Sequence, residues 1–220
     1  MKSLKEHILE GILDIEDNIN YDISKDVIEE FFKENYKIYG SYTIKGTKDG
    51  FIVDVKGSVK VINKNITSLT NGLFEFNLVE GEFLCSYCKN LTSLEGAPKE
   101  VGGTFECYGC KALTTLEGAP KEVGGCFYCS ECILLKTLKG APEKVGESFY
   151  CSGCKALTTL EGAPEKVGRD FSCSDCKSLK TLKGAPKEVG ESFCCSGCGT
   201  QFTKDDVKKY INVKKCIFIN

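Results

Sequence analysis

The hydrophobic residues of this chain fall into three successive patterns, and the first is helical. Up to about residue 36, apolar residues recur every three or four positions, which predicts two helices. Ser3 and Glu6 have the spacing of a capping box at the start of the first helix, over residues 3–13, and Ser24 is predicted to begin the second. We therefore expect a helical segment at the N-terminal end of the fold.

Between residues 36 and 62, apolar and polar positions alternate. This period of two predicts short strands, because successive side chains of a strand point to opposite faces. Gly50 and Gly57 stand in two polar stretches, 48–50 and 56–58, which are expected to be hairpin turns. The pattern predicts a β-meander after the helices.

The third pattern is a unit of 22 residues that returns six times between residues 81 and 199. Each copy starts with Phe-x-Cys-x-x-Cys, and the first five continue with Leu-x-x-Leu-(Glu/Lys)-Gly-Ala-Pro. A fixed period of this length predicts a solenoid, since one unit is too small to bury its apolar face and must stack on its neighbours. The copies begin at Phe83, Phe105, Phe127, Phe149, Phe171 and Phe193.

The predicted fold is a mainly β repeat solenoid of short parallel strands with irregular return arms. Terminal repeats are expected to be atypical, because one side of each faces solvent or a cap. Thr203 and Asp206 have the capping spacing of a short closing helix, and a final strand is expected at 216–219. The expected boundaries are 1–58 for an N-terminal cap of two helices and β-hairpins, 59–80 for a degenerate first repeat, 81–199 for six regular repeats and 200–220 for a C-terminal cap.

One unit also resembles a known repeat family. Residues 105–113 follow the pattern L-x-x-L-x-L-x-x-(N/C)-x-L, with Phe and Cys in place of two leucines and one extra residue before the last Leu. The chain therefore resembles the leucine-rich repeat family over about residues 59–199, and residues 91–103 resemble the short repeats that tailed phages and gut bacteria encode. The resemblance implies a protein-binding scaffold without catalytic residues, phage-encoded and acting on a host or virion partner in the host cytoplasm.

The paired cysteines have two opposing interpretations. The first of each pair shares the face of the core Phe, and the second occupies the Asn/Cys position of the family, so the simpler expectation is buried free thiols without a cofactor. The spacing C-x2-C-x18-C-x2-C also matches a four-thiolate zinc signature, so stacked pairs could instead hold zinc or an iron–sulfur cluster. The ligands in that alternative are Cys85, Cys88, Cys107, Cys110, Cys129, Cys132, Cys151, Cys154, Cys173, Cys176, Cys195 and Cys198. Strand phase places two further cysteines, Cys126 and Cys194, on the outward face.

Outward residues that differ between the copies are the candidates for function, because the strand faces of a repeat array form one continuous surface. Tyrosines converge near the middle of the array, and tyrosine is favoured at binding hot spots. The alternative is a cross-strand aromatic pair with a serine ladder that only stabilises the sheet. The candidate partner-binding residues are Glu106, Tyr108, Tyr128, Tyr150, Glu131 and Asp175.

Composition narrows the function further. The 220 residues carry a net charge of −2, so a basic surface for nucleic acid is not expected, and no apolar run is long enough to span a membrane. The only histidine is His7, and no phosphate loop, nucleophile elbow or paired carboxylate points to an enzyme. Fifteen cysteines without an export signal favour a reducing cytoplasm.

We therefore expect a non-enzymatic protein–protein interaction scaffold. Its partner is a protein of unknown identity rather than nucleic acid or membrane, and self-association through a solenoid edge is an open alternative. A metal-binding or redox protein built on the cysteine pairs is the competing hypothesis.

Overall fold

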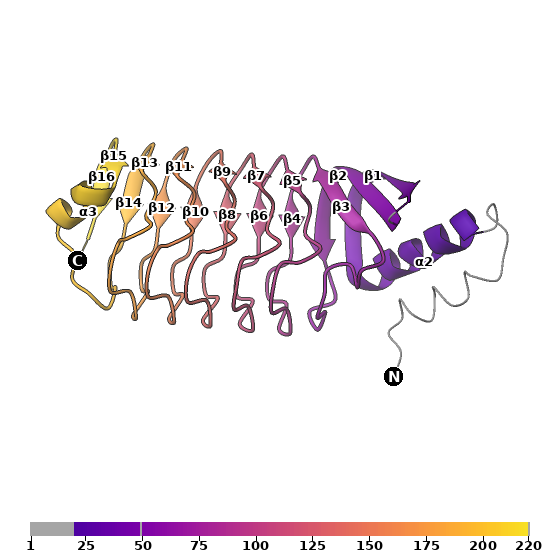
Figure 1. The fold of residues 1–220 in the computed structure, drawn as a ribbon, viewed down its shortest axis with the longest axis horizontal. Coiled ribbons are helices and arrows are strands. Elements are labelled where there is room, and N and C mark those ends of the chain that lie inside the picture. The colour runs from indigo at the N-terminus through magenta and orange to yellow at the C-terminus, as the bar shows by residue number, and fades with distance from the viewer. Residues whose placement is uncertain (1–19, 49, 220) are drawn as a thin grey trace.

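The computed structural model describes residues 20–48 and 50–219, with the side chains of residues 20–24 left out. These residues form an elongated parallel β-solenoid, with a helix and a long hairpin at the N-terminal end and a short helix at the other (Figure 1). The solenoid confirms the predicted fold class. The first predicted helix, over residues 3–13, lies outside the described residues.

The N-terminal cap consists of α2 (Asn20–Asn35), β1 (Tyr36–Thr47) and β2 (Gly50–Val61). Strands β1 and β2 pair antiparallel along their whole length, and β2 also pairs in parallel with the first strand of each of two rows. The cap is therefore continuous with the solenoid sheet, and β1 covers an edge that would otherwise be open.

Each coil of the solenoid contributes one short strand to each of two rows. The Phe row consists of β4 (Phe83–Leu84), β6 (Phe105–Glu106), β8 (Phe127–Tyr128), β10 (Phe149–Tyr150), β12 (Phe171–Ser172), β14 (Ser192–Cys194) and β16 (Cys216–Phe218). The Val row consists of β3 (Glu75–Val79), β5 (Glu100–Val101), β7 (Glu122–Val123), β9 (Lys144–Val145), β11 (Lys166–Val167), β13 (Glu188–Val189) and β15 (Asn212–Val213). The Val row lies on the return arm of each coil. The sequence predicted an irregular return arm without a strand, and this part of the prediction is wrong.

Two details of the N-terminal prediction are wrong. Helix α2 begins at Asn20 rather than at Ser24, so Ser24 lies inside the helix. The turn predicted at 56–58 does not exist, because Gly57 continues β2 opposite Gly40 of β1. At each of these two glycines a Cβ would overlap a carbonyl oxygen of the facing strand. Gly57 therefore permits a close contact between two strands and does not reverse the chain.

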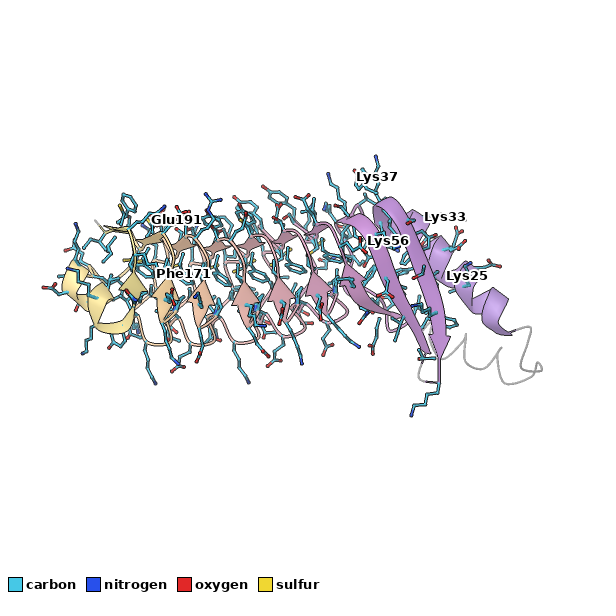
Figure 2. All side chains as sticks on the ribbon, turned by 90° about the horizontal axis from the view of Figure 1, so that it is seen from above. Lys25, Lys33, Lys37, Lys56, Phe171 and Glu191 are labelled. Carbon is cyan, nitrogen blue, oxygen red and sulfur yellow. The ribbon has the colours of Figure 1, made fainter. Side chains whose placement is uncertain are left out.

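A continuous stack of phenylalanine rings fills the interior of the solenoid. Neighbouring rings lie 5.2–5.5 Å apart, with interplanar angles of 3–14°. Phe171, for example, is fully buried between the two rows (Figure 2). The coil spacing sets this geometry, because identical side chains in register repeat at the distance between neighbouring parallel strands, about 4.8 Å. Leucines and the valines of the second row complete the core.

Glycine is required where one coil passes close to the next. A Cβ at Gly168 would overlap the carbonyl oxygen of Gly146 in the preceding coil. Gly118 adopts φ +89°, which L-residues rarely adopt, and its missing Cβ faces the backbone of Leu94 and Glu95. Coils that pack this closely leave no room for a side chain at either position.

Charged residues outside the rows alternate in sign between coils and form ion pairs. Lys139 Nζ lies 3.5 Å from Glu117 Oε1, and Lys183 Nζ lies 2.8 Å from Glu161 Oε1. All four side chains are exposed, so each pair contributes little to stability. The alternation mainly keeps like charges from facing each other across the stack.

The C-terminal end is closed as the sequence predicts. Helix α3 (Lys204–Tyr210) begins after Thr203, whose side chain forms a capping box with Asp206. The last residues form β15 and β16, which add one strand to the end of each row. Among the described residues, no helix has the length and apolar character needed to cross a membrane.

Removing one ring of the Phe stack should destabilise the protein strongly. We expect Phe149→Ala to lower the free energy of unfolding by about 3–5 kcal/mol, because it leaves a cavity between rings that the rigid coils cannot close. The neighbouring change Tyr150→Ser, on the outward face of the same strand, should cost under about 1.5 kcal/mol. Urea denaturation followed by circular dichroism measures both; equal losses would contradict a core that depends on ring stacking.

Candidate functional site

The outward face of the Phe row contains a shallow depression of about 610 Å³ near the middle of the solenoid. It spans three consecutive coils. Its lining brings together five of the six candidate residues predicted from the sequence and adds two serines. The lining residues are Glu106, Tyr108, Tyr128, Ser130, Glu131, Tyr150 and Ser152.

Two stacked tyrosines form one side of the depression and small residues form its floor. The rings of Tyr128 and Tyr150 lie 4.8 Å apart and are inclined by 11°. Ser130 and Ser152 occupy the next outward position of the same two coils, and Ser130 Oγ accepts a hydrogen bond of 3.1 Å from the backbone N–H of Ser152. The floor is low because serine stands where the preceding coil has Tyr108.

The other lining residues close the depression at its N-terminal side. Glu106 Oε1 accepts a hydrogen bond of 2.6 Å from Ser86 Oγ, which holds the carboxylate toward the preceding coil. Tyr108 packs edge-to-face against Tyr87, with ring centroids 5.2 Å apart. Both residues are thus anchored by partners outside the depression.

Glu131 stands at a turn position where the backbone is left-handed in every regular coil. The residues at this position alternate strictly between a side chain and glycine: Tyr87, Gly109, Glu131, Gly153, Asp175 and Gly197. A Cβ at each of these glycines would crowd or overlap the side chain of the preceding coil. The glycine of the following coil leaves room for each of these side chains and suits the left-handed backbone there.

Asp175 is the candidate residue that the structure leaves outside the depression. It lies two coils beyond Glu131, and its Oδ1 is 2.8 Å from Lys177 Nζ. Sequence reasoning did not select Ser130 and Ser152 as site residues. The sequence indicates them only indirectly, because a small residue stands at each of these positions next to a tyrosine. This becomes informative only when equivalent positions of neighbouring coils are compared.

Partial loss of hydration raises the pKa of two of the three phenols further above neutral pH. The pKa of Tyr128 is raised to about 12, first by burial and then by the neighbouring Cys126 thiol, Tyr150 and Glu106. The pKa of Tyr108 is also raised, by partial loss of hydration and by Tyr87 and Glu131. At neutral pH both side chains are hydrogen-bond donors as well as apolar surfaces.

The cysteine pairs form two buried columns beneath this face. The first cysteine of each pair lies in the core with the phenylalanines, as predicted. The second donates its S–H to the backbone carbonyl of the first cysteine in the preceding coil, at 3.2–3.3 Å. These contacts join Cys110 to Cys85, Cys132 to Cys107, Cys154 to Cys129, Cys176 to Cys151 and Cys198 to Cys173. The thiols thus link each coil to the one before it through weak hydrogen bonds.

This arrangement does not fit a four-thiolate metal centre. Such a centre needs four sulfurs around one point, about 2.3 Å from the ion. Within residues 20–48 and 50–219, no three His, Cys, Asp or Glu side chains converge in a way that could hold a metal. Burial also raises the pKa of several of these thiols, which are therefore protonated at neutral pH in the metal-free protein. These thiols include Cys85, Cys129 and Cys151.

Four cysteines are at least partly exposed. Cys126 and Cys194 are partly exposed on the outward face, as strand phase predicts, and Cys216 on β16 is exposed. Cys198, in the last regular coil, is also partly exposed. The thiol of Cys173 donates to Cys198 and holds the pKa of Cys198 below its usual range.

Thiol reactivity should separate these two groups. We expect Cys126, Cys194, Cys198 and Cys216 to react rapidly with iodoacetamide in the folded protein, and the eleven buried cysteines to react only after unfolding. Mass spectrometry of peptides identifies the labelled positions. Anaerobically purified protein should show the same pattern with and without a chelator; stoichiometric zinc or iron, or new reactive thiols after chelation, would instead support the metal-binding alternative.

Stability should fall at alkaline pH. Burial raises the folded-state pKa of Cys85, Cys129 and Cys151, so unfolding releases protons once the pH exceeds the unfolded value of about 8.5. Below that pH, each buried thiol contributes its full share to the free energy of unfolding. At pH 10 this share is lower by about 2 kcal/mol per thiol. Urea denaturation at pH 7.5 and pH 10 measures the change. In Cys129→Ala, the free energy of unfolding should differ less between pH 7.5 and pH 10 than it does in the wild type. An equal difference in the two proteins would show that the Cys129 thiol does not cause the loss of stability.

Comparison of the chain with protein-family models, with curated proteins and with solved structures gave no match in any of the three. Function must therefore be inferred from the residues and geometry of this chain.

Proposed function

We propose that this protein is a non-enzymatic interaction scaffold that binds a protein partner through the tyrosine-lined depression on its Phe row. The depression is the observation that carries the proposal. It lies where the coils depart from their common sequence, and it gathers three tyrosines and two glutamates on one face. A solenoid of stacked coils is consistent with a scaffold or interaction role.

The physical chemistry of the lining supports binding rather than catalysis. Tyrosines offer large contact areas at a low cost in conformational entropy, and their hydroxyl groups can satisfy polar groups of a partner. Tyr128 and Tyr150 are already stacked on each other, so their orientation is set before a partner arrives. A preorganised surface loses less entropy on binding than a flexible one.

The repeat sequence adds a proposal about origin. The resemblance of residues 91–103 to short repeats of tailed phages and gut bacteria favours a phage-encoded scaffold that acts on a host or virion protein in the host cytoplasm. The binding proposal itself rests on the depression and does not depend on this origin.

Selection from a random peptide library displayed on phage tests the proposed function. Peptides are selected on the wild-type protein and then measured on the double variant Tyr128→Ser/Tyr150→Ser. Serine is chosen because Ser172 occupies the equivalent position two strands further along the Phe row from Tyr128, so the fold tolerates it. We expect the selected peptides to lose about tenfold or more in affinity for the double variant, since each tyrosine removed is a hot-spot contact.

The matched control is Tyr210→Ser, which removes a partly exposed tyrosine of the C-terminal cap outside the depression. This variant should bind the selected peptides as the wild type does. If the selected peptides bind the double variant unchanged, the depression is not the binding site and the proposal fails.

A further inference from the structure

We infer that the depression accepts a cationic side chain, specifically an arginine presented by an extended segment of the protein partner. This inference rests on the proposed function and specifies what the depression recognises. Two features of the lining support it: two carboxylates without a cationic partner, and a stacked pair of tyrosines beside one of them.

Glu106 and Glu131 place two carboxylates in the lining of the depression. Many glutamates of the coils pair with lysine or arginine of an adjacent coil, whereas Glu106 and Glu131 belong to those that do not. The paired residues are Glu117, Glu122, Glu147, Glu161, Glu165, Glu188 and Glu191. Among the described residues, the lining of the depression includes no basic side chain, and neither Glu106 nor Glu131 forms an ion pair. The site therefore presents two negative charges that this part of the chain does not neutralise.

The tyrosine stack has one ring face directed toward those charges. Tyr150 belongs to the following coil and covers one face of Tyr128. The opposite face of Tyr128 is therefore directed toward the preceding coil, where Glu106 is its partner in the strand register. The hydrogen bond from Ser86 holds the Glu106 carboxylate toward the coil before that. A planar cation above Tyr128 would contact both the ring face and the carboxylate.

Arginine fits this geometry better than other ligands. Its guanidinium group is planar, stacks on aromatic faces and binds carboxylates through two parallel N–H groups. Lysine could satisfy the charge but not the stacking or the paired hydrogen bonds. Glu131 also lines the depression, so a second cation of the same extended segment would find a second carboxylate there.

Replacing charge without changing shape tests the inference. The probe is a fluorescein-labelled heptapeptide with two arginines separated by one serine, and its twin carries citrulline, which is neutral and nearly isosteric, in place of both arginines. Fluorescence anisotropy at low salt measures binding of both peptides to the full chain. We expect the citrulline peptide to bind about tenfold more weakly or worse, because it loses the cation–π contact and the charge-assisted hydrogen bonds.

Matched variants locate the effect. Glu106→Gln/Glu131→Gln should remove the difference between the two peptides, whereas Glu161→Gln, which changes one charge outside the depression, should preserve it. Equal binding of the arginine and citrulline peptides to the wild type would overturn the inference.

The library selection separates this failure from failure of the proposed function. If selected peptides depend on Tyr128 and Tyr150 but contain no arginine, the depression binds partners by another chemistry and only the cationic inference falls. Binding of an oligosaccharide at the tyrosines in place of any peptide would overturn both.

Discussion

The stacking of nearly identical coils at one fixed spacing is the constraint on which the rest of the structure depends. Parallel strands in register place equivalent residues of neighbouring coils about 4.8 Å apart. This distance suits flat rings, and the core phenylalanines accordingly stack at 5.2–5.5 Å. The same distance excludes a Cβ where backbones cross, so Gly168 and its equivalents are determined by geometry rather than by any ligand.

The cysteine columns follow from the same constraint. At this spacing the second cysteine of one coil reaches the carbonyl of the first cysteine in the coil before it, and a thiol is small enough to fit there while still donating a weak hydrogen bond. A motif that resembles a zinc signature along the chain thus contributes buried packing and hydrogen bonds between coils in this structure. Among the described residues, no three His, Cys, Asp or Glu side chains are placed to hold a metal ion.

Function is argued from the places where the coils differ. A strictly repeated outward surface would be uniform along its length, and the depression exists because three coils exchange serine, tyrosine and glutamate at equivalent positions. Because the spacing between coils is fixed, each change of residue alters the outward surface at a defined place. Two successive tyrosines stack, two successive serines leave a floor, and the lining includes two glutamates but no basic side chain.

The sequence by itself determined the solenoid, the inward phase of phenylalanine and cysteine, the capping box at Thr203 and the outward rows, because each follows from a short period or a local spacing. It did not determine the second strand row, the continuous strand through Gly57 or the bond from Ser86 to Glu106. These depend on which residue of another coil or strand lies opposite, which local propensity does not encode. Tertiary structure alone decided that five candidate residues share one depression and that Asp175, paired with Lys177, does not.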